Sequence, residues 1–144
     1  MKIYIAGALT HGAEKKLKEL YLEIGKFCKQ NGFENAYVPC YMGTDPIKNP
    51  DVAAEKVWEI DEREVSSSDL IIAYVGEPSL GVGGELEIAR AAGRDIILWW
   101  FTDQKVSRMA LGNPAVIARL EIKDKQELFK QLKVILKEKY RNQS

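Results

Sequence analysis

Histidine and cysteine are scarce in this chain of 144 residues: His11 is the only histidine, and Cys28 and Cys40 are the only cysteines. One histidine argues against a histidine-based zinc site and against a Ser-His-Asp triad. Two cysteines without metal-ligand spacing give neither a disulfide framework nor a metal site, and this usage is typical of a reducing, cytoplasmic setting.

Excess charge and long apolar runs are missing as well. Lys and Arg total 21 and are balanced by 21 Asp and Glu. Without a basic stripe, a nucleic-acid polymer is not an expected partner. No apolar run approaches the length of a membrane span, and no signal peptide precedes the first expected strand, so we expect no membrane association. The length and the 46% apolar content fit one domain over residues 1–144.

Strand-like and helix-like segments alternate along the chain. The expected strands are residues 2–6, 36–38, 70–75, 95–101 and 116–122. The expected helices are residues 13–30, 50–67, 85–92 and 125–140. The central strands are apolar throughout, which is typical of a parallel sheet covered on both faces. The chain therefore predicts an α/β fold, a single-domain doubly wound sheet of the flavodoxin or Rossmann-like kind, with about five strands and helices on both faces.

A glycine-rich loop, residues 76–84, is expected between the third strand and a helix that opens on Glu85. It lacks the Gly-Lys-Ser/Thr of a phosphate-binding P-loop and the Gly-x-Gly-x-x-Gly of a dinucleotide site. Glycines and a helix start favour an anion, which Glu85 would repel unless its carboxylate itself does chemistry. Equally, Glu85 is compatible with a plain strand–turn–helix in which an acid favours the positive end of the helix dipole.

Other polar residues have two interpretations each. Asp61 interrupts the apolar stripe of its helix, either as a functional acid or as part of a salt bridge at the helix edge, for example with Arg63. Tyr4 is a packing residue or a hydroxyl that reaches the site from below. Ser79 is a turn serine or a ligand contact, and Thr10 and His11 are loop residues that face solvent or substrate.

Three segments carry a resemblance to a known family. They are Lys-Ile-Tyr-Ile-Ala-Gly at residues 2–7, Ser-Asp-Leu-Ile-Ile-Ala at residues 68–73, and Pro-Ser-Leu-Gly-Val-Gly-Gly-Glu-Leu at residues 78–86. With Asp61, they resemble the nucleoside 2-deoxyribosyltransferase superfamily. The last and longest segment is similar to the branch of 2′-deoxynucleoside 5′-monophosphate N-hydrolases. The superfamily also includes CMP N-glycosidases.

The resemblance implies a role for each matching residue. Glu85 takes the place of the catalytic glutamate, Asp61 that of the catalytic aspartate, and Tyr4 that of the tyrosine that hydrogen-bonds the glutamate. Ser79 takes the place of a phosphate-binding serine, and Ser107 that of a serine supplied by a neighbouring subunit. The remaining implied substrate contacts are Gly7, Thr10, Gly81 and Gly83. No cofactor and no metal is implied.

The implied reaction is cleavage of an N-glycosidic bond by a carboxylate that attacks C1′ and forms a covalent glycosyl-enzyme. A semi-buried Asp61 with a raised pKa would protonate the leaving base, and Tyr4 would orient Glu85 and keep it ionised. Ala8 and Thr10 depart from the hydrolase pattern, because both replace partners of the 5′-phosphate. Gly84 replaces a bulky residue and could widen the pocket. The substrate is therefore a nucleoside or a nucleoside 5′-monophosphate, with the base and the sugar left open.

Three alternatives remain. The first is a base-exchanging deoxyribosyltransferase, in which Asn142 of the tail could complete the site. The second is a non-catalytic nucleotide-binding module, and the third is a phosphoribohydrolase of the lysine-decarboxylase-like family. The run Trp99-Trp100-Phe101 predicts a homodimer or higher homo-oligomer, because strand alternation should leave part of it for a partner to cover.

Overall fold

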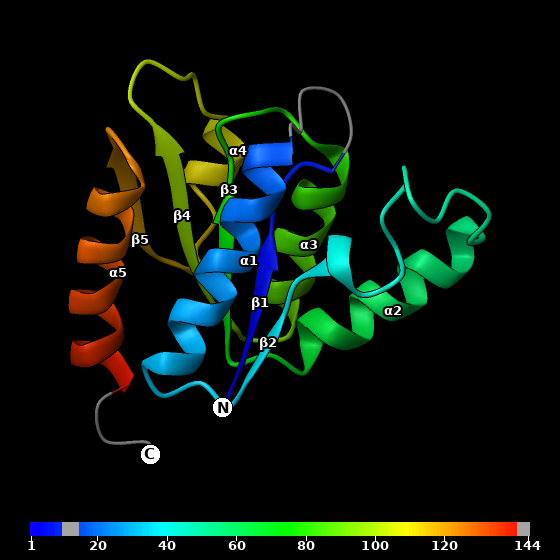
Figure 1. Ribbon diagram of the computed structural model, residues 1–144, viewed down its shortest axis with the longest axis horizontal. Coiled ribbons are helices and arrows are strands. Elements are labelled where there is room, and N and C mark those ends of the chain that lie inside the picture. Colours follow the sequence, from blue (N-terminus) through cyan, green and yellow to red (C-terminus); the bar gives the residue numbers. More distant parts are fainter. Residues whose placement is uncertain (10–14, 141–144) are drawn as a thin grey trace.

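A five-stranded parallel sheet forms the centre of the computed structural model, which describes residues 1–9 and 15–140 (Figure 1). The strands are β1 (Lys2–Ala6), β2 (Asn35–Tyr37), β3 (Leu70–Tyr74), β4 (Asp95–Phe101) and β5 (Val116–Ile122). Their order is β2-β1-β3-β4-β5, and each neighbouring pair is parallel. The order reverses direction between β1 and β3, where ligands of such folds bind beyond the carboxyl ends of the strands.

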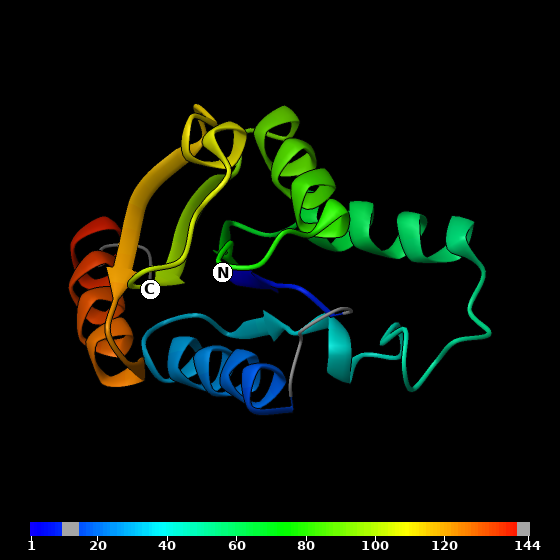
Figure 2. The same ribbon diagram turned by 90° about the horizontal axis from the view of Figure 1, so that it is seen from above.

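Helices cover both faces of the sheet, as Figure 2 shows from above. They are α1 (Lys15–Gln30), α2 (Ala54–Ser66), α3 (Leu80–Ala91), α4 (Arg108–Leu111) and α5 (Lys125–Tyr140), with a 3₁₀ turn at Pro39–Tyr41. Helices α1 and α5 lie on one face, and α2, α3 and α4 lie on the other. The doubly wound parallel sheet expected from the sequence is confirmed.

Strand alternation divides the core into two layers. On β1, Ile3 and Ile5 point toward α1 and α5, whereas Tyr4 and Ala6 point toward α2 and α3. The layer under α1 and α5 is filled by long apolar and aromatic side chains, including the fully buried Ile72 and Trp99. The layer under α2 and α3 is where the candidate site lies.

The expected bounds of β1, β4, β5 and α5 are confirmed, but two helix starts were wrong. Helix α3 begins at Leu80, five residues before Glu85, because the Ser79 side chain accepts a hydrogen bond from Val82 N and caps it. Helix α2 begins at Ala54 instead of near Pro50, because residues 45–49 close a separate turn through the Asn49 N to Asp45 O bond (2.7 Å).

Smaller differences affect the other segments. Strand β2 lies one residue earlier than expected, at Asn35–Tyr37, and strand β3 ends at Tyr74 rather than at residue 75. The region 102–114, expected as a loop, contains α4 with Ser107 as its cap. Residues 13 and 14, expected to open the first helix, lie outside the described residues.

The aromatic run at the end of β4 is covered only in part by the chain itself, because Trp100 and Phe101 stay partly exposed, and the expected partner stays a prediction. Trp99 is fully buried, with ring centroids 4.6 Å from Tyr74 and 5.6 Å from Phe101. Trp100 points to the opposite face and packs partly buried in the other layer. The large apolar side chains that stand exposed are elsewhere, among them Trp58, Leu80 and Met109.

Within residues 1–9 and 15–140, none of the helices has both the length and the apolar character needed to span a bilayer.

Candidate active site

A cavity of about 330 Å³ opens at the carboxyl edge of the sheet, between α2, the start of α3 and the long segment that joins β2 to α2. The side chains with polar or ionisable groups in its lining are Asp61, Glu85, Ser79, Thr44 and Asn49. The other lining residues are Gly7, Leu9, Pro46, Pro50, Val52, Val57, Gly81 and Val82. The structure thus brings together residues that are far apart in the sequence.

Glu85 enters the cavity from the second turn of α3. Its neighbours on the helix, Val82 and Leu86, are buried against the sheet and fix the orientation of the helix. The Oε2 atom of Glu85 is buried and has no hydrogen-bond partner among the described residues. A buried carboxyl oxygen without a partner is costly, and such groups are concentrated at functional sites.

Asp61 faces the same cavity from α2, one helical turn after Val57, which also lines it. Its Oδ1 atom is likewise buried and has no hydrogen-bond partner within the described part of the chain. Arg63, the expected salt-bridge partner, instead lies 3.6 Å from Glu64 (Nε to Oε1). The interpretation of Asp61 as one half of a salt bridge with Arg63 is therefore wrong.

Tyr4 lies fully buried in β1, and its ring stacks on that of Tyr37 with centroids 5.5 Å apart and planes inclined by 13°. The hydroxyl lies close enough to both carboxyl groups to lower their pKa values as a donor. Its geometry nevertheless falls short of an ordinary hydrogen bond to any described residue. Tyr4 thus lies near Glu85, as expected, but without an ordinary hydrogen bond to it.

Burial governs the charge state of the two acids. Burial raises the pKa of Glu85 to about 8; the Tyr4 hydroxyl opposes this shift and the nearby Asp61 adds to it. Burial raises the pKa of Asp61 to about 6; Tyr4 again opposes the shift and Glu64 adds to it. The raised pKa of Asp61 agrees with expectation. Tyr4 does favour the ionised form of Glu85, but burial outweighs its effect.

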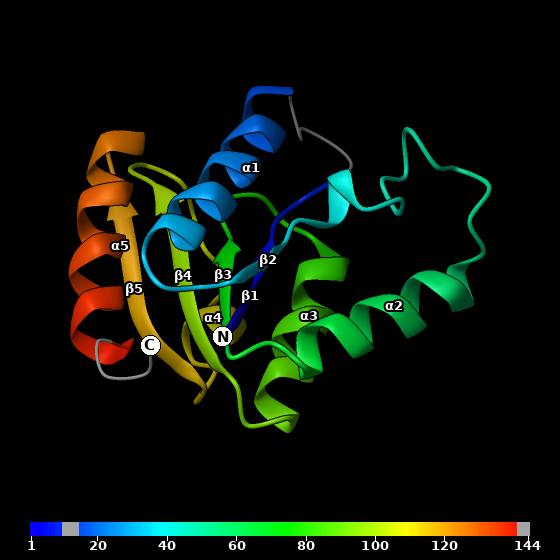
Figure 3. The same ribbon diagram turned by 60° about the horizontal axis from the view of Figure 1, so that its bottom comes forward.

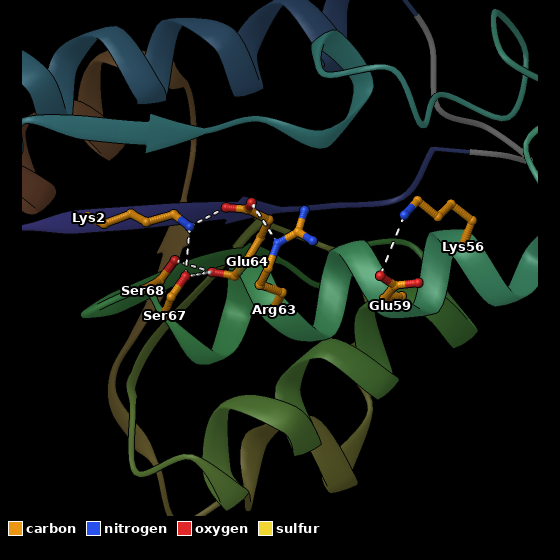
Figure 4. Close-up of polar contacts among 7 residues, drawn as sticks. All are labelled: Lys2, Lys56, Glu59, Arg63, Glu64, Ser67 and Ser68. Atoms are coloured by element: carbon orange, nitrogen blue, oxygen red, sulfur yellow. Dashed lines mark hydrogen bonds and ion pairs between the residues drawn. The ribbon is translucent and has the colours of Figure 1, made fainter.

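The C-terminal end of α2 is bound to β1 by polar contacts that Figure 4 shows. The Lys2 ammonium group pairs with Glu64 and donates to Ser67 Oγ at 2.8 Å. Ser68 Oγ donates to the backbone oxygen of Glu64 at 2.6 Å. These contacts hold the helix turn that carries Asp61 against the strand that carries Tyr4, because Glu64 follows Asp61 by three residues.

The glycines before Glu85 lie within α3 and not in a loop, which corrects the expected position of the helix start. None of Gly81, Gly83 and Gly84 has a positive φ, so none is required by backbone strain. Ser79 and Gly81 line the cavity at the N-terminus of α3, where unpaired N–H groups favour an anion or a hydroxyl. Gly83 lines a neighbouring cavity instead.

Gly7 ends β1 at the floor of the cavity. A β-carbon at this position would lie 2.2 Å from the Tyr21 ring, whose hydroxyl donates to the backbone oxygen of Ala8 at 3.2 Å. A glycine is therefore required where the chain passes from the strand into the site. Thr10 and His11, expected in the same loop, lie outside the described residues.

Ser107 does not reach the cavity of its own chain. It lines a second cavity of about 430 Å³ between α3 and α4, together with Ser79, Gly83 and Val106, and it caps α4 by accepting from Ala110 N at 3.4 Å. The expected action of Ser107 on another subunit stays a prediction.

The sequence predicted no site residue in the long segment between β2 and α2. Five of its residues line the cavity: Thr44, Pro46, Asn49, Pro50 and Val52. The length of the loop was the available signal, since long loops in compact domains are often functional. Among the described residues, no three His, Cys, Asp or Glu side chains lie close enough together to hold a metal ion.

The sequence matches the family model described as nucleoside 2-deoxyribosyltransferase over residues 3–132. A protein of Methanococcoides burtonii with the provisional name 2′-deoxynucleoside 5′-phosphate N-hydrolase 1 is 26% identical over 115 residues. The aligned region covers 78% of this chain and 91% of that protein.

Two solved structures share the fold. The CMP N-glycosidase of Clostridium botulinum superposes with a TM-score of 0.66 at 18% identity, over 92% of this chain and 98% of that one. The 2-deoxyribosyltransferase of Bacillus psychrosaccharolyticus superposes with a TM-score of 0.68 at 17% identity, over 92% of this chain and 90% of that one. At these identities the likeness concerns the fold.

Proposed function

Because the chain belongs to the nucleoside 2-deoxyribosyltransferase family, we propose that it cleaves the N-glycosidic bond of a nucleoside or nucleoside 5′-monophosphate and releases the free base. The observation that carries this proposal is that Glu85 and Asp61 face one cavity, each with one buried oxygen that lacks a hydrogen-bond partner among the described residues, and that the Tyr4 hydroxyl lies close to both. Glycoside hydrolysis uses a pair of carboxyl groups, one that donates a proton to the leaving group and one that attacks the sugar as a carboxylate.

In the first step, Glu85 attacks C1′ of the sugar. A bond forms between C1′ and a Glu85 oxygen, the bond from C1′ to the base nitrogen breaks, and its electron pair leaves with the base. Asp61 donates its proton to the departing base. The Tyr4 hydroxyl beside Glu85 favours the carboxylate at the moment when positive charge develops on the sugar.

In the second step, water attacks C1′ and releases Glu85 as a carboxylate, while Asp61 takes up the proton that the water loses. This returns one proton to the pair, so the reaction consumes one water and yields free base and free sugar. The active form therefore carries one proton on the two acids. Because the pKa of Glu85 (about 8) lies above that of Asp61 (about 6), the single proton resides mainly on Glu85 near neutral pH, and it must pass to Asp61 before Glu85 can attack.

Base exchange is the second candidate, because the family model carries the name of that reaction. In that case a second base, in place of water, attacks the glycosyl-enzyme. Asn142, the residue suggested for such a role, lies outside the described residues. Incubation of deoxyinosine with adenine separates the two reactions: a new deoxynucleoside indicates transfer, whereas free sugar indicates hydrolysis.

The 5′ end of the sugar lies, in this proposal, at Ser79 and the N-terminus of α3. The lining of the cavity contains no Lys or Arg among the described residues. Asp61 and Glu85 are the ionisable groups of the described lining. A dianionic phosphate would therefore rely on backbone N–H groups and on residues from another subunit, such as Ser107.

We also propose a homodimer or higher homo-oligomer in the cytoplasm. The exposed Leu80 and Met109 beside the second cavity support a subunit contact there, with Ser107 directed at a neighbouring chain. Two free, buried cysteines, Cys28 and Cys40, support a reducing compartment. Light scattering at micromolar concentration tests the assembly, and a monomer would contradict it.

Chromatographic detection of free base from a panel of ribo- and deoxyribonucleosides, with and without 5′-phosphate, tests the main proposal. Glu85→Ala should lower the rate on the order of 10³-fold or more, because the nucleophile is lost. Glu62→Ala, which removes an exposed acid of α2, is the matched control. If base is released equally by wild type and Glu85→Ala, Glu85 is not the nucleophile. If neither protein releases base but both bind nucleotides, the chain is a binding module.

A further inference from the structure

One wall of the catalytic cavity is made by residues 42–53, here called the wall segment. Its five lining residues were named above, and it contains no helix or strand. Figure 3 shows the segment extending beyond the edge of the sheet before it turns back into α2. A wall without regular secondary structure needs another source of rigidity if it is to hold a substrate in one geometry.

Asp45 lies at the centre of the wall segment and is completely buried. Its Oδ1 accepts hydrogen bonds from Ile47 N (2.8 Å) and Lys48 N (3.3 Å), and its backbone oxygen accepts from Asn49 N (2.7 Å). Its neighbours in sequence, Thr44 and Pro46, both line the cavity, as does Asn49. One side chain therefore shapes the turn that presents three of the five lining residues.

The remaining oxygen of Asp45 binds Lys18 of α1, with 3.0 Å between Oδ2 and Nζ. The Lys18 side chain is only 12% exposed, so this ion pair is largely shielded from water. Burial alone would raise the pKa of Asp45, but the hydrogen bonds from Lys18, Ile47 and Lys48 outweigh it and hold the pKa below its usual value. Asp45 is therefore a charged, fully bonded anchor.

The ion pair is also the polar tie between the wall segment and the rest of the fold. Among the described residues, the other hydrogen bonds of residues 42–53 reach no farther than Pro39 on one side and Val57 on the other. Lys18 lies on α1, which packs through Leu20 and Ile24 into the opposite layer of the core. The tie thus fixes a segment without helix or strand to a helix that packs on the core.

We propose that the Lys18–Asp45 ion pair is a positioning element that holds the wall of the catalytic cavity in place. Lys18, which is not among the residues that line the cavity, thereby controls how well the nucleoside is bound. The effect on substrate binding rests on the proposed function. The restraint of residues 42–53 by the ion pair does not depend on it.

The test uses the full chain with Lys18→Met, Asp45→Asn and the charge-conserving Lys18→Arg. Lys26→Met, which removes an exposed lysine from the same helix, is the matched control. Amide hydrogen exchange of peptides that cover residues 42–53 measures the restraint, and peptides from β3 report on the global fold. Steady-state kinetics with the best substrate then separate KM from kcat.

We expect Lys18→Met and Asp45→Asn to speed exchange in the wall segment while β3 stays protected. Both should lower kcat/KM on the order of 10- to 100-fold, mainly through a higher KM, since small displacements of positioning groups have effects of this size. Lys18→Arg should recover most of the loss, and Lys26→Met should behave as wild type.

Unchanged exchange in residues 42–53 for both Lys18→Met and Asp45→Asn would overturn the restraint. Faster exchange with kcat/KM within twofold of wild type would overturn the effect on substrate. Faster exchange in β3 as well would mean a general loss of stability rather than a local one, and would also count against the inference. If wild type cleaves no nucleoside, the proposed function fails, whereas the exchange data still decide whether the ion pair restrains the wall.

Discussion

The two layers that flank the sheet differ in what their interiors contain. The layer between the sheet and α1 and α5 is packed with residues such as Ile72, Trp99 and Leu132, all fully buried. The layer under α2 and α3 is built from the same strands, yet it contains carboxyl oxygens of Asp61 and Glu85 without hydrogen-bond partners among the described residues. The first layer is arranged for stability, and the second gives up stability for chemistry.

Strand alternation makes this division possible. Neighbouring residues of β1 point to opposite faces, so Ile3 and Ile5 can serve one layer while Tyr4 and Ala6 serve the other. The small Ala6 and the hydroxyl of Tyr4 leave room and polarity on one side without weakening the other. The comparison predicts opposite responses to substitutions in the two layers, and four experiments test it.

The largest change in stability should come from Leu132→Ala in α5. Leu132 is fully buried, and removal of its side chain leaves a cavity that costs about 2–5 kcal/mol of unfolding free energy. Denaturant unfolding measures the loss. Val134→Ala, an exposed position of the same helix, should change stability little; comparable losses at both positions would remove the basis for calling this layer the stable one.

Glu85→Gln should increase the free energy of unfolding at alkaline pH, whereas Leu132→Ala lowers it. The folded-state pKa of Glu85 is raised to about 8, so the folded protein binds a proton more tightly than the unfolded chain, and stability falls as pH rises from about 4.5 to about 8. The neutral glutamine avoids this loss and should stabilise the fold on the order of 2 kcal/mol at pH 9.

The gain from Glu85→Gln should disappear near pH 4, where the glutamate itself is protonated in both states. Thermal unfolding between pH 4 and pH 9 measures it, with Glu62→Gln as the exposed control that should show no such trend. A Glu85→Gln variant that is less stable than wild type at pH 9 would mean that the carboxylate has partners in solution that compensate its burial.

Tyr4→Phe tests how the Tyr4 hydroxyl affects the charge states of Asp61 and Glu85. The Tyr4 hydroxyl lowers the pKa of both Asp61 and Glu85, so its removal should raise both values and move the pH–rate profile toward higher pH. At pH 7 we expect kcat/KM to fall on the order of tenfold, the equivalent of about 1.4 kcal/mol. Tyr37→Phe, which keeps the stacked ring, is the control, and a profile that shifts equally in both variants would argue against a specific role of Tyr4.

Ser79→Ala should produce the smallest of the four effects. The loss of the cap on α3 should cost about 1 kcal/mol of unfolding free energy. Ser79→Asp keeps a capping oxygen and adds negative charge at the cavity, so it should retain stability while it weakens binding of any 5′-phosphorylated substrate. Stability lost equally in both variants would show that Ser79 contributes by something other than its cap.

The sequence predicted well the parts of the fold that have strong local signals. Strands β1 and β4 are short and mostly apolar, whereas β5 ends in an alternation of polar and apolar residues, and the bounds of all three are confirmed. The start of α3 was missed because three glycines outweighed a helix signal that was present, namely Ser79 as cap. The aromatic run of β4 was interpreted without knowledge of Tyr74, which packs against it from the neighbouring strand.

The candidate site was predictable only in part, for a physical reason. Glu85 and Asp61 stand out because acids seldom interrupt apolar patterns, and the structure brings both into one cavity with Ser79 and Gly7. The wall segment could not be assigned, because its contribution depends on the contact between Asp45 and Lys18, which are 27 positions apart. Neither Gly83 nor Ser107 lines the cavity of its own chain, so their expected contacts with substrate stay predictions.

The glycines of α3 affect which mutations the site can accept during evolution. At Gly83 and Gly84 a β-carbon would meet no atom within 4 Å, and the backbone is helical, so alanine fits both positions without rearrangement. Each such replacement should also strengthen the helix by about 1 kcal/mol. New side chains beside the Glu85 carboxylate are therefore accessible by single steps that the fold tolerates, which makes this helix a place where, on the proposed function, substrate range can diversify without a prior stabilising mutation.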